Sequence, residues 1–341
     1  MNAIKYVMLF FAMLGALDRI IGNRFGLGKE FEKGFMLLGN MALSMIGMIV
    51  ISPLIADLLE PVFAFVSGTL RIEPSIIPAS LFANDMGGAP LAKEIAVDEG
   101  MGMFNALVVS SMLGCTISFT IPYALGIVEA RQHKPLLLGL LCGIVTIPLG
   151  CLIGSLVLQL PLGALLMNLL PLVLFSVLVA VGLLLCPDAC VKIFNGFGIF
   201  IKILITIGLA LSVLRFLTGI EVIKGLATLE EGAAVCLNAA AVMSGAFPLM
   251  AVVSRLLTKP RKQLGRRMGV GETAAMGFLS SLATSMITFP MMKDMEDKGV
   301  LLNAAFSVSA AFTFAGHLAF TMAFDARHIT SMIVAKLTEG V

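Results

Sequence analysis

The chain has 341 residues, of which 59% are hydrophobic and only 13% are charged, and its formal net charge is +2. An ordinary soluble domain has about a quarter of its residues charged, so this composition, with a mean hydropathy of +1.02, excludes that class and indicates a protein of the lipid bilayer. The small net charge gives no reason to expect a nucleic-acid partner.

Apolar runs of about 20 residues or more predict helices that cross the membrane. The first run, Ile4 to Ile21, has no basic leader and no A-x-A cleavage site, which indicates a retained helix rather than a cleaved signal peptide. Further runs predicted to span the membrane are, in chain order, 31–59, 101–128, 135–160, 162–186, 191–217, 229–257 and 301–324. The last segment, 328–341, would rise only about 21 Å as a helix, less than a hydrocarbon core of about 30 Å. We therefore expect either a chain that has been trimmed here or a helix at the membrane interface.

Two apolar segments, 74–97 and 273–298, are interrupted by residues that break helices. These residues are Pro78, Gly87, Gly88 and Pro90 in the first segment and Gly277, Thr288 and Pro290 in the second. An interrupted helix leaves backbone N–H and C=O groups unpaired, which a membrane tolerates only where the segment lines a polar cavity or is buried in protein.

The two broken segments are similar in sequence and indicate an internal duplication. SLFANDMGGAPLAKEI from Ser80 aligns with SSLATSMITFPMMKDM from Ser280, which places Lys93 opposite Lys293. A second match aligns FEKGFMLLGNMALSMIG from Phe31 with LEEGAAVCLNAAAVMSG from Leu229. Paired broken segments in the two halves of a membrane protein are typical of a transporter's substrate site.

The distribution of charge predicts that the two copies have opposite orientations. The loop after the second long helix is strongly basic, with Arg255, Lys259, Arg261, Lys262, Arg266 and Arg267, and is expected on the cytoplasmic side. Its counterpart after the first long helix carries Asp57, Glu60 and Glu73 with only Arg71. The basic turn at 131–134 is cytoplasmic as well only if segment 74–97 enters and leaves by the same face. We therefore expect re-entrant hairpins.

The predicted fold is an all-α polytopic membrane protein built from two inverted-topology repeats. Residues 1–160 form the first repeat with hairpin 74–97, residues 161–187 form a linking transmembrane helix, and residues 188–341 form the second repeat with hairpin 273–298. The chain has no nucleotide P-loop, no HExxH motif and no Ser-His-Asp order in a polar context. We therefore expect no catalysis, no cofactor and no metal site.

Asp85 is the candidate residue with the clearest chemistry. A carboxylate within a broken apolar segment costs several kcal/mol unless a cation, hydrogen-bond donors or water compensate it. It could bind a cationic substrate, a coupling ion or a proton; alternatively, it could pair with Lys93 or cap a helix at a buried break.

Polar groups expected near Asp85 would fix the orientation of a small ligand. They are Ser80, Asn84 and the backbone at Gly87 and Gly88 in the first hairpin, and Thr284, Ser285 and Thr288 in the second. Asn105, Asn303 and His317 lie within predicted spanning helices and are further candidates. Alternatively, the hydroxyls bond to their own helices, the asparagines join neighbouring helices, and His317 is a hydrogen-bonded core residue.

Four stretches resemble the EutH family of ethanolamine utilization transporters. They are FEKGFMLLG from Phe31, NDMGGAPLAKEIA from Asn84, GIVTIPLGC from Gly143 and NAAFSVSAAFTFAGHLAF from Asn303. The resemblance implies uptake of ethanolamine across the bacterial inner membrane. The chain departs from the family pattern at Gly316, where the family has an acidic residue before the histidine, and at Thr284 and Ser285, where it has asparagines. A relaxed or altered amine specificity would follow from these departures.

Charge and resemblance together predict a transporter that imports ethanolammonium, or a similar small amine, by alternating access. Asp85 would take the ammonium group, and hydroxyl and amide groups would take the hydroxyl. The alternatives are a channel-like facilitator with a fixed pore and a membrane docking protein that uses the basic loop at 261–267. The expected partners are the amine and membrane lipid, and a homo-oligomer is compatible with the sequence.

Overall fold

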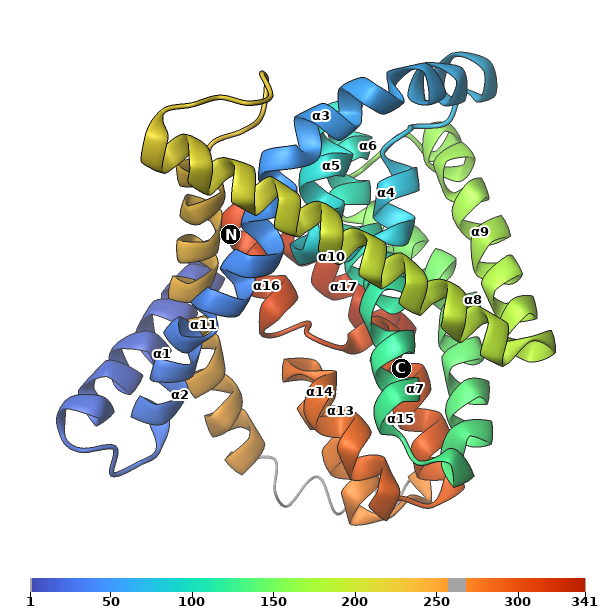
Figure 1. Cartoon of the computed structure of the whole chain (residues 1–341). Helices are drawn as coiled ribbons and strands as arrows, with labels where there is room; N and C mark the ends of the chain where they lie inside the picture. The colour runs from blue at the N-terminus through green and yellow to red at the C-terminus, as the bar shows by residue number, and fades with distance from the viewer. Residues whose placement is uncertain (1, 257–267, 341) are drawn as a thin grey trace.

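The computed structural model describes residues 2–256 and 268–340, and every regular element in them is a helix, as predicted (Figure 1). Helical stretches in the described residues that are long and apolar enough to cross a membrane are Leu27–Leu70, Glu99–Ile127, Ala130–Leu156, Leu162–Leu185, Ile199–Thr218 and Leu229–Val253. The predicted first span forms a helix but is not among them. Of the predicted basic loop, Lys259 to Arg267 lie outside the described residues.

The helices occur along the chain in the following order. Those up to residue 156 are α1 (Asn2–Ile20), α2 (Leu27–Met36), α3 (Leu38–Leu70), α4 (Ile76–Leu81), η1 (Asn84–Met86), α5 (Gly88–Glu94), α6 (Glu99–Phe104), the π-helical η2 (Asn105–Gly114) and η3 (Thr116–Thr120), α7 (Ile121–Ile127), η4 (Ala130–Gln132) and α8 (His133–Leu156). The remaining elements are α9 (Leu162–Leu185), α10 (Pro187–Thr218), α11 (Leu229–Leu256), α13 (Glu272–Ala283), α14 (Ser285–Met291), η5 (Met292–Asp294), α15 (Asp297–Ala310), α16 (Gly316–Asp325), η6 (Ala326–His328) and α17 (Ile329–Gly340).

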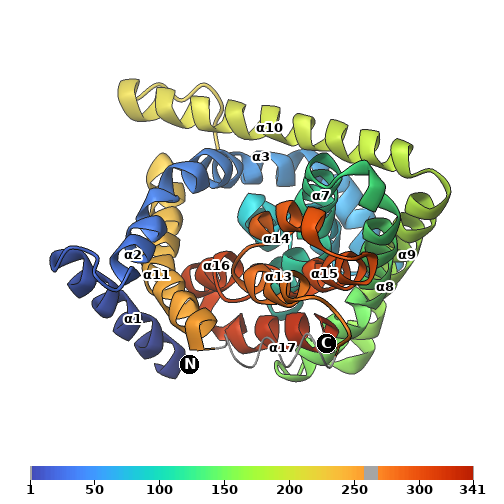
Figure 2. The same ribbon diagram turned by 90° about the horizontal axis from the view of Figure 1, so that it is seen from below.

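In end view, α13, α14 and α16 lie near the middle of the molecule, with α3, α11, α17 and α8 around them and α10 along the outside of α3 (Figure 2). In the described part of the chain, the largest hydrophobic core is built mainly by the continuous helix from α6 to α7 and by one face of α8, whose side chains toward the core are almost fully buried. Residues of both halves contribute to this core, so the second half of the chain packs directly against the first.

Helix α8 presents glycines to the helices of the second half. A Cβ atom on Gly139 would lie 2.2 Å from the carbonyl oxygen of Leu301 in α15, and one on Gly154 would lie 2.6 Å from Cβ of Ala335 in α17. Because no side chain separates the backbones at these positions, Ser331 Oγ can donate a 2.7 Å hydrogen bond to the carbonyl oxygen of Gly154. Small residues that allow such close approach are typical of helix contacts in membranes.

Helix α17 packs one face into the protein. Ser331, Met332, Ala335 and Lys336 are all almost completely buried, because the glycine face of α8 admits the short helix into the protein. Burial among other helices removes the length requirement that applies to a lipid-exposed span.

The first broken segment turns between α4 and α5. Helix α4 ends at Leu81, and Phe82 is extended, with φ −120° and ψ 139°. Gly87 has φ +105°, a conformation that favours glycine, and a Cβ atom there would lie 2.0 Å from Cγ of Met48. The two ends of the segment lie together, because the Glu73 carboxylate accepts 2.9 Å hydrogen bonds from the N–H groups of Val97 and Asp98.

The second broken segment turns at Thr284, which is extended, with φ −163° and ψ 129°, between α13 and α14. Its ends also lie together, because the N–H of Gly271 donates a 2.8 Å hydrogen bond to Oε1 of Glu296. In both segments hydrogen bonds therefore join the two ends of the segment.

The predicted span 301–324 is not one helix, because residues 311–315 are unwound between α15 and α16. The N–H groups of Phe312 and Phe314 instead donate 2.9 Å hydrogen bonds to the carbonyl oxygens of Ser281 and Leu282, at the end of α13. These bonds between two interrupted helices replace helical hydrogen bonds, so this break is stabilised by tertiary contact.

We expect Gly139→Val to destabilise the protein, because a branched side chain cannot fit against the carbonyl of Leu301. Overpacking of this kind costs about 1–3 kcal/mol, which thermal unfolding of detergent-solubilised protein will show as a lower midpoint. Gly163→Val is the matched control, since no atom lies within 4 Å of the position that its Cβ would take. Equal midpoints for the two variants would contradict the packing assigned to α8.

Candidate functional site

Asp85 lies in η1, at the turn of the first broken segment. Among the described residues, no basic group lies within ion-pair distance of its carboxylate, and its own N–H donates a 3.0 Å hydrogen bond to Oδ1 of Asn84. Lys93 instead lies over the ring of Phe324, with Nζ 5.5 Å from the centroid. The alternative of an Asp85–Lys93 ion pair is therefore not observed.

A buried lysine, which sequence reasoning missed, lies on α17. Lys336 is 1% exposed, and its Nζ donates a 2.7 Å hydrogen bond to the carbonyl oxygen of Ser111 in η2. It interacts electrostatically with Asp85 without contacting it. The signal in the sequence was a lone lysine in the apolar run ITSMIVAKL, since an ionisable residue among apolar ones in a membrane protein is a candidate by default.

His317 begins α16, directly after the unwound residues 311–315. The side chain is 2% exposed, its ring centroid lies 5.2 Å from that of Phe312, and it interacts electrostatically with Lys336. Helix α16 contacts η1, so the third break lies next to the turn that carries Asp85.

Several buried polar atoms on these segments have no hydrogen-bond partner. Within the described residues, they are Nδ2 of Asn84, Oγ of Ser285, Oδ1 of Asn303, Oγ of Ser309, Nδ1 of His317 and Oγ1 of Thr321. Native proteins pair nearly all such groups with protein or ordered water. A set of unpaired donors and acceptors on the interrupted helices is therefore suited to a small polar ligand.

The other predicted site residues have structural contacts. The Thr288 hydroxyl donates to the carbonyl of Gly277 at 3.1 Å and lies 2.8 Å from the Ser281 hydroxyl. Thr284 caps α14, its Oγ1 accepting a 3.2 Å bond from the N–H of Met286.

Ser80 lines a cavity, whereas the paired glycines pack against protein. Ser80 faces a separate cavity of about 290 Å³ that Pro171 and Phe175 also line. A Cβ atom on Gly88 would lie 2.1 Å from Oγ of Ser110, so this glycine serves close packing, as Gly87 does.

Asn105 and Asn303 act as corresponding ties at the bases of the two broken segments. Asn105 Nδ2 donates to Oγ of Ser75 at 2.9 Å and to Oδ1 of Asn168 at 3.0 Å, and Asn168 donates back at 2.7 Å. Asn303 Nδ2 donates to the carbonyl of Ala274 at 3.0 Å. Both side chains hold the start of a broken segment to the helix that follows it.

Two further cavities lie near the turn and the end of the first broken segment. One, of about 460 Å³, lies between η1 and α10 and is mostly apolar; it is lined by residues that include Phe82, Met86 and Ser118. The other, of about 400 Å³, lies between the end of α5 and the end of α16 and is polar.

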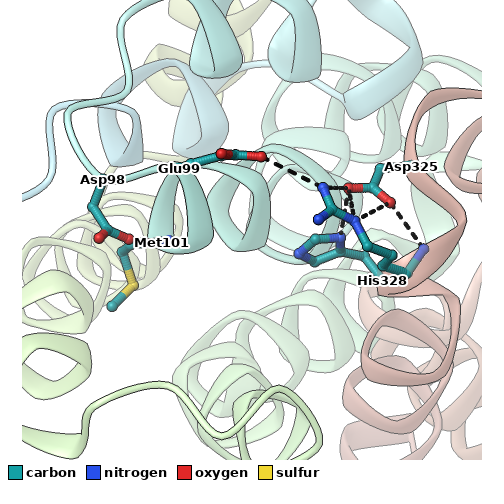
Figure 3. A network of polar contacts seen from close by, with 6 residues as sticks. Asp98, Glu99, Met101, Asp325 and His328 are labelled. Atoms are coloured by element: carbon teal, nitrogen blue, oxygen red, sulfur yellow. Dashed lines mark hydrogen bonds and ion pairs between the residues drawn. The ribbon is translucent and has the colours of Figure 1, made fainter.

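The polar cavity is bordered by a charged cluster at Asp325 (Figure 3). Arg327 lies 2.7 Å from Asp325 and 3.5 Å from Glu99, and His328 Nδ1 lies 3.4 Å from Asp325. Burial acts to raise the pKa of Asp325, but the hydrogen bonds from Arg327 outweigh it and hold the pKa below its usual value. Burial lowers the pKa of His328, an effect that Asp325 opposes.

The whole chain, residues 1–341, matches a family model described as "Ethanolamine utilisation protein, EutH". A protein of Listeria monocytogenes named "Probable ethanolamine permease EutH" is 42% identical over 338 residues, which cover 99% of this chain and 91% of that protein. The protein of the same name from Salmonella typhimurium is 38% identical, covering 99% of this chain and 92% of the relative. "Uncharacterized protein YxeR" of Bacillus subtilis is 37% identical, covering 100% and 92%. No solved structure matches the chain.

We expect the Asn105–Asn168 pair to contribute to stability as a unit. Asn105→Ala and Asn168→Ala should each lower the unfolding free energy by about 1–3 kcal/mol, because each leaves a buried amide unpaired. The double variant should cost less than the sum of the two. Thermal unfolding in detergent measures all three, with the exposed Asn238→Ala as control. Additive costs would show that the reciprocal hydrogen bonds do not couple the two residues.

Proposed function

The chain belongs to the EutH family of ethanolamine utilisation proteins, and we propose that it carries ethanolamine across the membrane as the ammonium cation. It is a multi-pass membrane protein of bacteria. The observation that carries this proposal is the Asp85 carboxylate, which has no ion-pair partner among the described residues although it lies at a break within an apolar segment. The names of the relatives supply the amine, and the geometry supplies the charge that would bind it.

Ethanolammonium is compatible with the groups around Asp85. The carboxylate would take the ammonium group through charge-assisted hydrogen bonds, which are stronger than neutral ones. Among the described residues, Nδ2 of Asn84 and Nδ1 of His317 have no partner, and either could bond the hydroxyl; Oγ of Ser285 is a further unpaired group on the second broken segment. Gly316 adjoins this site with room for a side chain, since the nearest atom to its Cβ position is 3.7 Å away, so the missing acidic residue leaves Asp85 as the carboxylate there.

Lys336 would keep the site close to neutral before a cation binds. Its ammonium is buried and hydrogen-bonded to Ser111, so it stabilises the Asp85 anion from a distance without occupying it. An arriving cation would then meet a carboxylate that is not in contact with Lys336.

The proposed architecture is two inverted repeats, residues 1–160 and 188–341, joined by the linking helix at 161–187. Two features support it: hydrogen bonds join the two ends of each broken segment, and the Asn105 and Asn303 ties occupy corresponding places. In this architecture the segments 74–97 and 273–298 are re-entrant hairpins, and alternating access moves one repeat against the other around Asp85.

The charges of the turns support an orientation. Arg255 at the end of α11 donates to the carbonyl of Phe25 at 2.7 Å, and Arg131 donates to the carbonyl of Lys293 at 2.5 Å. These turns lie at the end of the molecule where α13 and α15 begin (Figure 1). Because basic turns prefer the cytoplasm, we place the base of the second hairpin inside and the base of the first outside.

Asp85→Asn should abolish ethanolamine uptake and weaken ethanolamine binding by about 100-fold or more, because it removes the negative charge that would pair with the ammonium group of the bound substrate. Uptake of radiolabelled ethanolamine into proteoliposomes measures this, with the exposed Asp57→Asn as control. Counterflow in the wild-type protein distinguishes a carrier from a fixed pore. Normal uptake by the Asn variant would refute the assignment of Asp85.

A double variant separates folding from binding. Asp85→Asn leaves Lys336 with less negative charge nearby and should lower the thermal midpoint, whereas Asp85→Asn with Lys336→Met removes both charges and should recover much of it. Neither protein should bind ethanolamine. A double variant that is stable and still binds the amine would show that the cation is held elsewhere.

A further inference from the structure

Two short turns, one in each half of the chain, share a sequence pattern. Residues 129–132 read Glu-Ala-Arg-Gln, and residues 325–328 read Asp-Ala-Arg-His. Each turn is closed by an ion pair between its acidic residue and its arginine, at 2.8 Å in the first and 2.7 Å in the second. Both turns follow the long helical segment that comes after a broken segment, so the duplication extends to η4 and η6.

The first turn is fastened to the second broken segment. Gln132 is 1% exposed, and its Nε2 donates to the carbonyls of Met292 at 2.5 Å and Met295 at 3.0 Å. Arg131 adds its 2.5 Å hydrogen bond to the carbonyl of Lys293. Side chains of the first half thereby hold the outgoing arm of the second half's hairpin.

The second turn makes no corresponding contact. The aligned acceptors are the carbonyls of Ala92, Lys93 and Ile95, and in the described part of the chain no side chain donates to them. Arg327 is directed to Asp325 and Glu99 instead. The polar cavity of about 400 Å³ lies here, with Lys93 on one wall and Asp325 and Arg327 on the other.

We propose that the two turns are alternating latches of the transport cycle, an inference that rests on the proposed function. In this structure the η4 latch is closed on the cytoplasmic side, and the η6 latch is open beside the polar cavity on the outer side. In the opposite state, Arg327 and His328 donate to the carbonyls of Ala92, Lys93 and Ile95, while Arg131 and Gln132 release Met292, Lys293 and Met295.

The chemistry of the two turns is suited to this exchange. Burial lowers the pKa of His328, so near neutral pH its imidazole carries an N–H donor without a charge, as the amide of Gln132 does. Each latch consists of a few hydrogen bonds. Their summed free energy is small enough for a binding event elsewhere in the protein to shift the equilibrium between the two states.

Single-cysteine labelling in proteoliposomes tests the proposal. In a background without the six native cysteines, Ala96→Cys reports on the polar cavity and Met292→Cys, at a buried position, reports on the closed latch. Gln132→Met removes donors from the closed latch and should shift the ratio of the two states by about 3- to 10-fold. Labelling at position 96 should then slow, and labelling at position 292 should accelerate.

His328→Met should act in the opposite direction, because it weakens only the state that is absent from this structure. Labelling at position 96 should be retained or accelerated, while ethanolamine uptake slows. Lys134→Gln, an exposed change beside the first turn, should alter neither rate. If Gln132→Met does not fold, Arg131→Met at an exposed position carries the same expectation.

Changes in the same direction for folded Gln132 and His328 variants, or no change in either, would overturn the latch proposal. The labelling needs no substrate, so its result does not depend on which amine is carried. A protein that fails to transport ethanolamine but shows the opposite shifts would refute the proposed substrate and leave the latches standing.

Discussion

The lack of hydrogen-bonding partners in a bilayer core is the constraint on which the centre of this protein depends. Three helices are interrupted, and in each case other parts of the chain compensate the backbone. Ser118 Oγ accepts from the N–H of Ala83, and Ser110 Oγ donates to the carbonyl of Phe82. The unwound residues 311–315 donate to the end of α13. The breaks are therefore stable features of the fold.

Because other residues pair the backbone at the breaks, the side chains of Asp85 and His317 are not used for that purpose. Residues such as Ser110 and Ser118 pair this backbone instead. Lys336 occupies a third position near them, tied to the carbonyl of Ser111. The proposed binding site for a cation needs a carboxylate that other charges stabilise from a distance and that no cation of the protein contacts.

The two halves of the chain are alike in design but differ in their contacts. Hydrogen bonds close the base of each broken segment, and an asparagine ties each base to the next helix. Yet Gln132 and Arg131 hold one hairpin, while Arg327 and His328 face a cavity beside the other. In the proposed transport cycle, an exact repeat of contacts would close both faces at once, and the asymmetry of these contacts is compatible with one state of that cycle.

The sequence by itself determined the helical class, the family, the two interrupted segments and the carboxylate at Asp85, because hydropathy, helix breakers and a buried charge are local properties. It could not determine which polar side chains are hydrogen-bonded within the protein, since Thr288 and Asn105 differ from Ser285 and Asn84 only in what the fold places beside them. The break at 311–315 contains no proline, and it exists because α13 offers carbonyls to the unwound backbone. Tertiary packing also decided the place of α17: the glycine face of α8 admits a helix too short to span a membrane and thereby brings Lys336 into the electrostatic range of Asp85.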